Sequence, residues 1–124
     1  MSPLTGIVVR GKGEARTIGY PTANIEYASP EAPSTGVLTC LVKTSEQELP
    51  GLAVIGMWTQ TNGLPSLEVH LLDFNQDLYG ATISVTLKTK LHEIIRFPNV
   101  EDLIRLIEQD VAAARTEFQS HIPR

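Results

Sequence analysis

The sequence predicts an all-β domain, a small antiparallel β-barrel, with one C-terminal amphipathic α-helix packed across it. Between residues 5 and 90, short β-branched and apolar runs alternate with hairpin-sized connections, the pattern of an antiparallel sandwich or barrel. Beyond residue 98 the apolar spacing changes to three and four residues, which is typical of a helix. A lone amphipathic helix must bury its apolar side, and only the strands are available to cover it. The 124 residues fit one domain over 1–124, with the barrel at about 5–90 and the helix at about 99–119.

Six segments have the composition of strands, rich in Val, Ile, Leu and Thr, and turn residues separate them. In chain order these segments are 5–10, 22–27, 36–43, 49–55, 67–73 and 82–90. Asn62-Gly63 is a strong turn signal between the fourth and the fifth. The third contains the single cysteine, Cys40, among apolar neighbours, so we expect a buried thiol and no disulfide within the chain.

The C-terminal helix is expected to begin after Asn99, a good N-cap residue that follows Pro98. Acidic residues at 101 and 102 would face the positive end of the helix dipole. The apolar residues recur at three- and four-residue spacing and should pack on the barrel. They are Val100, Leu103, Ile104, Ile107, Val111, Ala114 and Phe118.

The charge balance disfavours a long nucleic acid as a partner. Ten basic and 14 acidic residues give a net charge of −4, so there is no general attraction to a phosphate backbone. A small nucleotide is still compatible, because a divalent metal can neutralise its phosphates locally.

No apolar run reaches membrane-spanning length and residues 1–3 begin no signal peptide, so we expect a cytoplasmic protein without a membrane partner. A barrel covered by its own helix is expected to be a monomer.

Thr22 and Asn24 are the first candidate ligands. They follow Gly19-Tyr20-Pro21, and in an extended segment side chains two residues apart point the same way. Two neutral oxygens side by side suit a hard cation such as Mg²⁺, which takes its other ligands from water and substrate phosphates. The alternative is an ordinary turn leading into a strand.

A basic, glycine-rich segment precedes this pair. It differs from a P-loop, because position 13 is Gly rather than Ser or Thr and residues 7–9 form a strand where the loop should be. It also lacks the third glycine and the βαβ unit of a dinucleotide-binding motif. Its backbone N–H groups could nevertheless cup an anion; the alternative is a hairpin loop with incidental charge. The residues concerned are Gly11, Lys12, Gly13, Arg16 and Gly19.

The segment 67–73 contains a possible general base. Leu67, Val69 and Leu71 should enter the core, which leaves Glu68 and His70 together on the opposite face. Glu68 is either a solvated surface carboxylate or a positioned base. His70 by itself fits a hydrogen-bonded sheet histidine better than a ligand, and the nearby Asp73 and Asp77 fit turn residues.

Taken together, these motifs resemble the riboflavin kinase (flavokinase) family from about residue 5 to residue 118. Pro-Thr-Ala-Asn, Leu-Glu-Val-His and Leu-Tyr-Gly are specific in combination, although each alone is weak. The matching pieces are Gly-Ile-Val-Val-Arg-Gly at 6–11, Gly-Tyr-Pro-Thr-Ala-Asn at 19–24, Ser-Thr-Gly-Val at 34–37, Val-Ile-Gly at 54–56, Leu-Glu-Val-His-Leu-Leu-Asp-Phe at 67–74, Asp-Leu-Tyr-Gly at 77–80 and Arg-Phe at 96–97.

The resemblance implies a six-stranded Greek-key barrel that transfers the γ-phosphoryl group of ATP to the ribityl 5′-hydroxyl of riboflavin, giving FMN and ADP. It implies that Glu68 is the catalytic base and that Thr22 and Asn24 bind Mg²⁺, with Mn²⁺ or Zn²⁺ as alternative metals. The implied nucleotide-binding residues are Gly11, Lys12, Gly13, Arg16, Gly19, Pro21 and Thr22. The implied flavin-binding residues are His92, Phe97 and Leu103.

The sequence departs from the family pattern at Glu14, Ala15, His92 and Ile94. Glu14 places a negative charge near the expected phosphates, and His92 replaces a permanent cation with a titratable one. A flavin- or nucleotide-binding barrel with little or no turnover is therefore the alternative function. An oligonucleotide-binding barrel ranks last, because the chain lacks a basic composition. Many bacterial relatives carry an additional FAD-forming adenylyltransferase domain, an activity that we do not expect of this chain.

Overall fold

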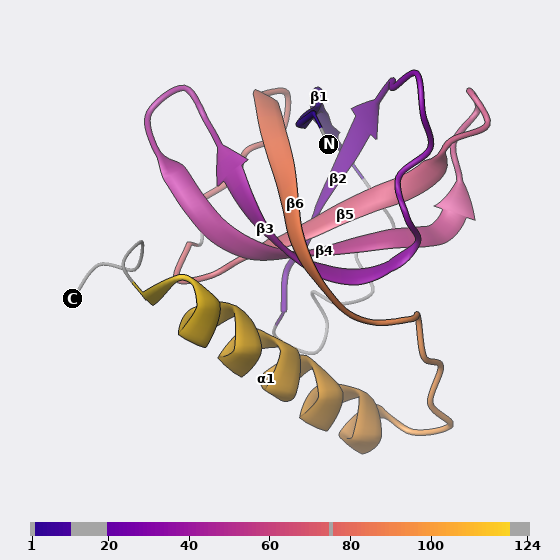
Figure 1. Ribbon diagram of the computed structural model, residues 1–124, viewed down its shortest axis with the longest axis vertical. Coiled ribbons are helices and arrows are strands. Elements are labelled where there is room, and N and C mark those ends of the chain that lie inside the picture. The colour runs from indigo at the N-terminus through magenta and orange to yellow at the C-terminus, as the bar shows by residue number, and fades with distance from the viewer. Residues whose placement is uncertain (1, 11–19, 75, 120–124) are drawn as a thin grey trace.

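The computed structural model describes residues 2–10, 20–74 and 76–119, which form six strands and one helix (Figure 1). The prediction of an all-β domain with one C-terminal helix is confirmed. The elements are β1 Leu4–Val9, β2 Ala23–Tyr27, β3 Gly36–Lys43, β4 Glu48–Thr59, β5 Pro65–Leu71, β6 Thr82–His92 and α1 Val100–Glu117. The helix lies beside the barrel as a separate layer, and it contacts β4 and β3.

The strands close into an antiparallel barrel in the order β1-β2-β5-β4-β3-β6, in which β6 pairs again with β1. Strands β3, β4 and β5 follow one another through hairpins, and β6 returns to lie beside β3. That arrangement is a Greek key, as the family resemblance implied. Three non-sequential pairings, β1 with β6, β2 with β5 and β3 with β6, bring together segments that lie far apart in the sequence.

Alternating residues of the strands fill the barrel, as the two-residue periodicity of strands requires. Leu67, Val69 and Leu71 are buried in the core, while Glu68 and His70 lie on the outer face, as predicted. Cys40 is also buried, as expected, and burial raises the pKa of its thiol. The core consists of Leu4, Val8, Ile25, Tyr27, Leu38, Cys40, Val42, Leu49, Ala53, Ile55, Leu67, Val69, Leu71, Ile83 and Val85.

Several predicted strand ends are wrong by a few residues, and the backbone explains two of them. The fifth strand ends at Leu71, because Asp73 adopts a φ of 55° in the turn that follows. The fourth strand runs on to Thr59 instead of ending at Ile55, because a bulge after Ile55 lets Thr59 pair with Pro65. Arg10 lies beyond β1, and Thr22 lies just before β2.

The helix begins where predicted, but the barrel covers only part of its apolar side. The side chain of Asn99 accepts a hydrogen bond from the backbone N–H of Asp102 at 2.9 Å, which confirms the N-cap. Ala114 is buried against barrel residues and Phe118 is also buried, whereas Val100 is 51% exposed. The expectation that the whole stripe is buried is therefore wrong for the first turn. Within the described residues, no helix is long and apolar enough to cross a membrane.

Polar side chains fasten the second half of the helix to the barrel. Arg115 donates two hydrogen bonds to the Asp73 carboxylate, at 2.6 and 2.8 Å. The Glu117 carboxylate accepts from the hydroxyl groups of Thr39 and Thr89, at 2.8 and 3.1 Å. These contacts join α1 to the turn after β5, to β3 and to β6, so the helix is held at several separate points.

We predict that Gly6→Ala destabilises the barrel by about 1–3 kcal/mol, because a new Cβ would overlap the carbonyl oxygen of Glu26 on the paired strand β2. Chemical unfolding monitored by circular dichroism would measure the change. Ile7→Val on the exposed face of β1 is the matched control, and its effect should stay within about 0.5 kcal/mol. Equal stabilities for Gly6→Ala and the wild type would contradict the tight β1–β2 packing.

Candidate active site

A cavity of about 540 Å³ opens at one rim of the barrel, within the range of about 300–1,000 Å³ that is usual for small-molecule sites. It lies where the end of β1, the segment that enters β2, the end of β5 and the turn before β6 meet. Three of the predicted site residues, Pro21, Thr22 and Asn24, line it. The other lining residues are Val8, Val9, Arg10, Ala23, Val69, Leu71, Phe74, Gln76, Asp77, Leu78 and Tyr79.

The pairing of β2 with β5 brings the three principal candidates together. Asn24 lies directly opposite Glu68 in the antiparallel register, and directly paired residues point to the same face of a sheet. The hydroxyl of Thr22 donates a hydrogen bond to Oε1 of Glu68 at 3.4 Å. Glu68 is not one of the lining residues, but it contacts one of them. A hydroxyl, an amide and a carboxylate therefore meet beside the cavity.

Asn24 is the most unusual of the three. It is 4% exposed, and its Oδ1 atom has no hydrogen-bond partner among the described residues. An unsatisfied buried polar group costs about 1–3 kcal/mol, so such an atom is often retained for a ligand. Oxygen donors of this kind fit Mg²⁺. No group of three or more His, Cys, Asp or Glu side chains in the described part of the chain could hold a metal by itself.

Arg10 and Tyr79 form a part of the site that the sequence analysis missed. The Arg10 guanidinium lies 4.2 Å from the centre of the Tyr79 ring, a cation–π contact between the end of β1 and the turn before β6. Asp77 accepts the backbone N–H of Tyr79 at 2.9 Å, which confirms the expected turn role of Asp77. Among the described lining residues, Arg10 is the one cation, which makes it a candidate for contact with an anionic ligand.

The glycine-rich segment predicted to bind the nucleotide falls outside the described residues. Its role, and the effects of Glu14 and Ala15, therefore stay predictions. The residues concerned are Gly11, Lys12, Gly13, Arg16 and Gly19.

The three predicted flavin-binding residues do not line the rim cavity. His92 ends β6, Phe97 lies in the connection to the helix, and Leu103 lies in the first part of α1. Phe97 and Leu103 are half-buried. Their assignment to the flavin stays a prediction. In the structure the ring of His92 contacts Glu93 and Asp110.

His92 joins the end of β6 to the middle of the helix. Its Nε2 atom lies 2.9 Å from both carboxylate oxygens of Asp110, and its Nδ1 atom lies 2.7 Å from the carbonyl oxygen of Glu93. Both nitrogens therefore face acceptors, an arrangement that suits the imidazolium form. Asp110 occupies a position of the helix that faces the barrel among apolar residues, and that break in the stripe is the sequence signal that was missed.

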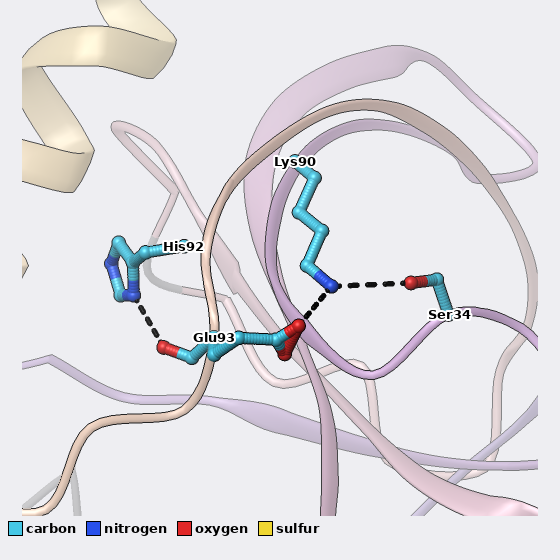
Figure 2. Close-up of polar contacts among 4 residues, drawn as sticks. All are labelled: Ser34, Lys90, His92 and Glu93. Atoms are coloured by element: carbon cyan, nitrogen blue, oxygen red, sulfur yellow. Dashed lines mark hydrogen bonds and ion pairs between the residues drawn. The ribbon is translucent and has the colours of Figure 1, made fainter.

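The start of the connection after β6 is fixed by a second polar cluster (Figure 2). Nζ of Lys90 donates to the hydroxyl oxygen of Ser34 at 3.3 Å and also contacts the carboxylate of Glu93. The carbonyl of Glu93 accepts from the ring of His92. The segment that leaves the barrel is thus tied to the loop before β3 and, through His92, to the helix.

The pKa of His92 is raised above its ordinary value. Burial, the largest single influence, lowers it, but the Glu93 carbonyl together with the hydrogen bond and the charge of Asp110 outweigh that effect. The pKa of Asp110 is also raised, because burial of its carboxylate exceeds the opposing influence of His92.

A family model described as riboflavin kinase (flavokinase) matches residues 2–118. The chain is 40% identical over 119 residues to the bifunctional riboflavin kinase/FMN adenylyltransferase of Haemophilus influenzae, a match that covers 94% of this chain and 39% of that protein. It is 32% identical over 121 residues to the RNA-binding riboflavin kinase RibR of Bacillus subtilis, covering 96% of this chain and 52% of that protein. The chain thus spans about half or less of the length of these curated relatives.

Two solved structures share the fold. A crystal structure titled as a macrolide-efflux protein from Streptococcus pneumoniae superposes with a TM-score of 0.82 at 33% identity, over 91% of this chain and 38% of that chain. Riboflavin kinase from Trypanosoma brucei superposes with a TM-score of 0.66 at 24% identity, over 96% of this chain and 82% of that chain.

We predict that the His92–Asp110 contact stabilises the fold more in mildly acidic solution than in alkaline solution. Because the folded pKa of His92 lies above its unfolded value, its contribution is present below the unfolded pKa and is lost as the pH rises through the folded pKa. The difference in thermal midpoint between the wild type and His92→Gln should therefore be larger at about pH 6 than at about pH 8.5. The same difference at both pH values would contradict the assignment.

Proposed function

Because the chain belongs to the riboflavin kinase family, we propose that it transfers the γ-phosphoryl group of ATP to the 5′-hydroxyl of riboflavin. A bond forms between the hydroxyl oxygen and the γ-phosphorus, the bond from that phosphorus to the β-phosphate oxygen breaks, and the products are FMN and ADP. The observation that carries the proposal is the meeting of Thr22, Asn24 and Glu68 beside the rim cavity. Phosphoryl transfer depends on in-line positioning and charge neutralisation, and side chains of this kind can provide both.

The Thr22 hydroxyl and the Asn24 amide oxygen would hold the metal ion. The buried Oδ1 of Asn24, which lacks a hydrogen-bond partner within the described part of the chain, supports this assignment, since a metal would satisfy it. Mg²⁺ is the proposed metal, with Mn²⁺ or Zn²⁺ as alternatives, and it would supply neutralisation of phosphate charge. The carboxylate of Glu68, beside Thr22, adds negative charge next to the same position.

Glu68 is the proposed general base. Its position on the outer face of β5 is fixed by the core residues on either side, Leu67 and Val69, which are buried. A base on a rigid strand can take the proton of the attacking hydroxyl without a conformational search. The residue as a whole is half-buried.

The nucleotide is proposed to bind in the rim cavity. The flavin is proposed to bind on the face of the barrel toward α1. Arg10 at the cavity would offset phosphate charge in a protein whose net charge is −4. The predicted nucleotide contacts are part of this proposal, namely Gly11, Lys12, Gly13, Arg16, Gly19, Pro21 and Thr22. His92, Phe97 and Leu103 remain the proposed flavin contacts, and the incomplete cover over the first part of the helix leaves apolar surface there.

We also propose a monomer in the cytoplasm, without a nucleic-acid or membrane partner. The acidic composition supports the absence of nucleic acid. Since one relative is named as RNA-binding, a mobility-shift titration with RNA at low salt is the direct check, and tight binding would overturn this part.

The function is tested by incubating the protein with riboflavin, ATP and Mg²⁺ and separating the flavins by chromatography. The expected result is FMN in amounts far above the protein concentration. Saturable quenching of riboflavin fluorescence without FMN would instead support the binding barrel without turnover.

We predict that Glu68→Gln folds normally and loses kcat by about 10²–10⁴-fold, because the amide cannot accept the hydroxyl proton. Riboflavin affinity should change little. Glu26→Gln is the matched control, since Glu26 is an exposed carboxylate on the neighbouring strand β2, and it should keep wild-type turnover. Undiminished turnover in Glu68→Gln would remove Glu68 from the mechanism.

We predict that Asn24→Leu lowers activity without lowering stability. Removing the buried Oδ1, which has no hydrogen-bond partner among the described residues, should leave the free energy of unfolding unchanged or raise it by about 1 kcal/mol. Loss of a metal ligand should lower FMN formation by about 100-fold. Asn24→Asp keeps an oxygen at the same position and should retain more activity. A leucine variant with the wild-type metal requirement would exclude Asn24 as a ligand.

A further inference from the structure

The segment that carries Thr22 enters β2 before the strand ladder begins. The register between β2 and β5 starts with Ala23 opposite Val69, and the register between β2 and β1 reaches only Asn24. Pro21 has no N–H group and cannot extend either ladder. Within the described pairs, the backbone of the sheet therefore fixes Asn24 but not Thr22.

Side chains on the outer face of β5 hold this segment instead. Nδ1 of His70 lies 2.8 Å from the carbonyl oxygen of Pro21, so the ring donates an N–H to it. The Tyr20 ring packs edge-on against the His70 ring, with centroids 5.6 Å apart and planes at 72°. Two residues earlier on the same face, Glu68 accepts from Thr22. Glu68 and His70 lie two residues apart on β5. Between them they contact three consecutive residues, Tyr20, Pro21 and Thr22.

We infer that His70 is a positioning residue that sets the location of the Thr22 hydroxyl for metal and phosphate binding. The inference rests on the proposed function and extends it to a residue outside the ligand set. Mg²⁺ requires near-ideal geometry, so a small displacement of one ligand weakens binding. The carbonyl that His70 holds belongs to the residue directly before Thr22, which leaves little freedom between the anchor and the ligand.

The contact is that of an anchor, because the Pro21 carbonyl oxygen can only accept and Nδ1 must donate to it. A residue that transferred a proton during the reaction would behave differently, because its substitution would change the pH profile.

The test compares His70→Leu, which removes the donor, with His70→Asn, which keeps an N–H donor near the position of Nδ1. In His70→Leu the Mg²⁺ concentration for half-maximal FMN formation should rise by about 10- to 100-fold, the range for residues that support metal ligands. The KM for riboflavin and the shape of the pH profile should stay unchanged. His70→Asn should restore the wild-type metal requirement. An unchanged requirement in His70→Leu, or an equal defect in both variants, would overturn the inference.

Hydrogen exchange of the substrate-free protein separates this inference from the proposed function. In His70→Leu the amides of Thr22 and Ala23 should exchange about tenfold faster relative to those of Ile25–Tyr27, and His70→Asn should reverse the change. Unchanged exchange would overturn the positioning role even if FMN forms. Faster exchange in a protein that makes no FMN would reject the kinase function and keep the anchor. His70→Val replaces the leucine variant if that variant does not fold, because valine also suits a strand.

Discussion

The pairing of β2 with β5 is the constraint on which the rest of the site depends. It places Asn24 opposite Glu68 on the outer face, and on the inner face it places Ile25 opposite Leu67, both of which are buried. A shift of one residue would turn the carboxylate into the core and the leucine into water. Packing of the apolar interior therefore fixes the relative positions of Asn24 and Glu68 on the outer face. The hydrogen bonds between β2 and β5 thus contribute both to stability and to the arrangement of the site.

Local sequence patterns were sufficient to predict most elements of the fold. Strand positions and the cap at Asn99 depend on neighbouring residues, so periodicity and turn chemistry suffice for them. Strand ends are less local: the length of β4 depends on a bulge opposite β5. The Greek-key topology came from the family resemblance, since periodicity does not say which strands are neighbours.

In the candidate site, too, features that depend on neighbouring residues were predictable from the sequence, and those that depend on distant residues were not predictable from local patterns. The shared face of Glu68 and His70 follows from their spacing, whereas the approach of Thr22 to Glu68 spans 46 residues and came from the motif combination. The contacts of Arg10 with Tyr79 and of His92 with Asp110 join segments far apart in the sequence and were found only in three dimensions. The ring of His92, assigned to the flavin through the resemblance, contacts the Asp110 carboxylate of the helix, and its flavin role stays a prediction.

Closure of the barrel between its first and last strands has a consequence for synthesis of the protein. The hydroxyl groups of Thr5 and Ser84 meet at 2.9 Å although they are 79 residues apart. At about 5–20 residues per second, β1 waits roughly 4–16 s on the ribosome before its second neighbour, β6, exists. During that interval one side of β1 has unpaired backbone groups that can recruit a strand from another nascent chain. Crowded polysomes and slow elongation through the segment that encodes β6 would therefore favour strand-exchanged dimers over the closed barrel.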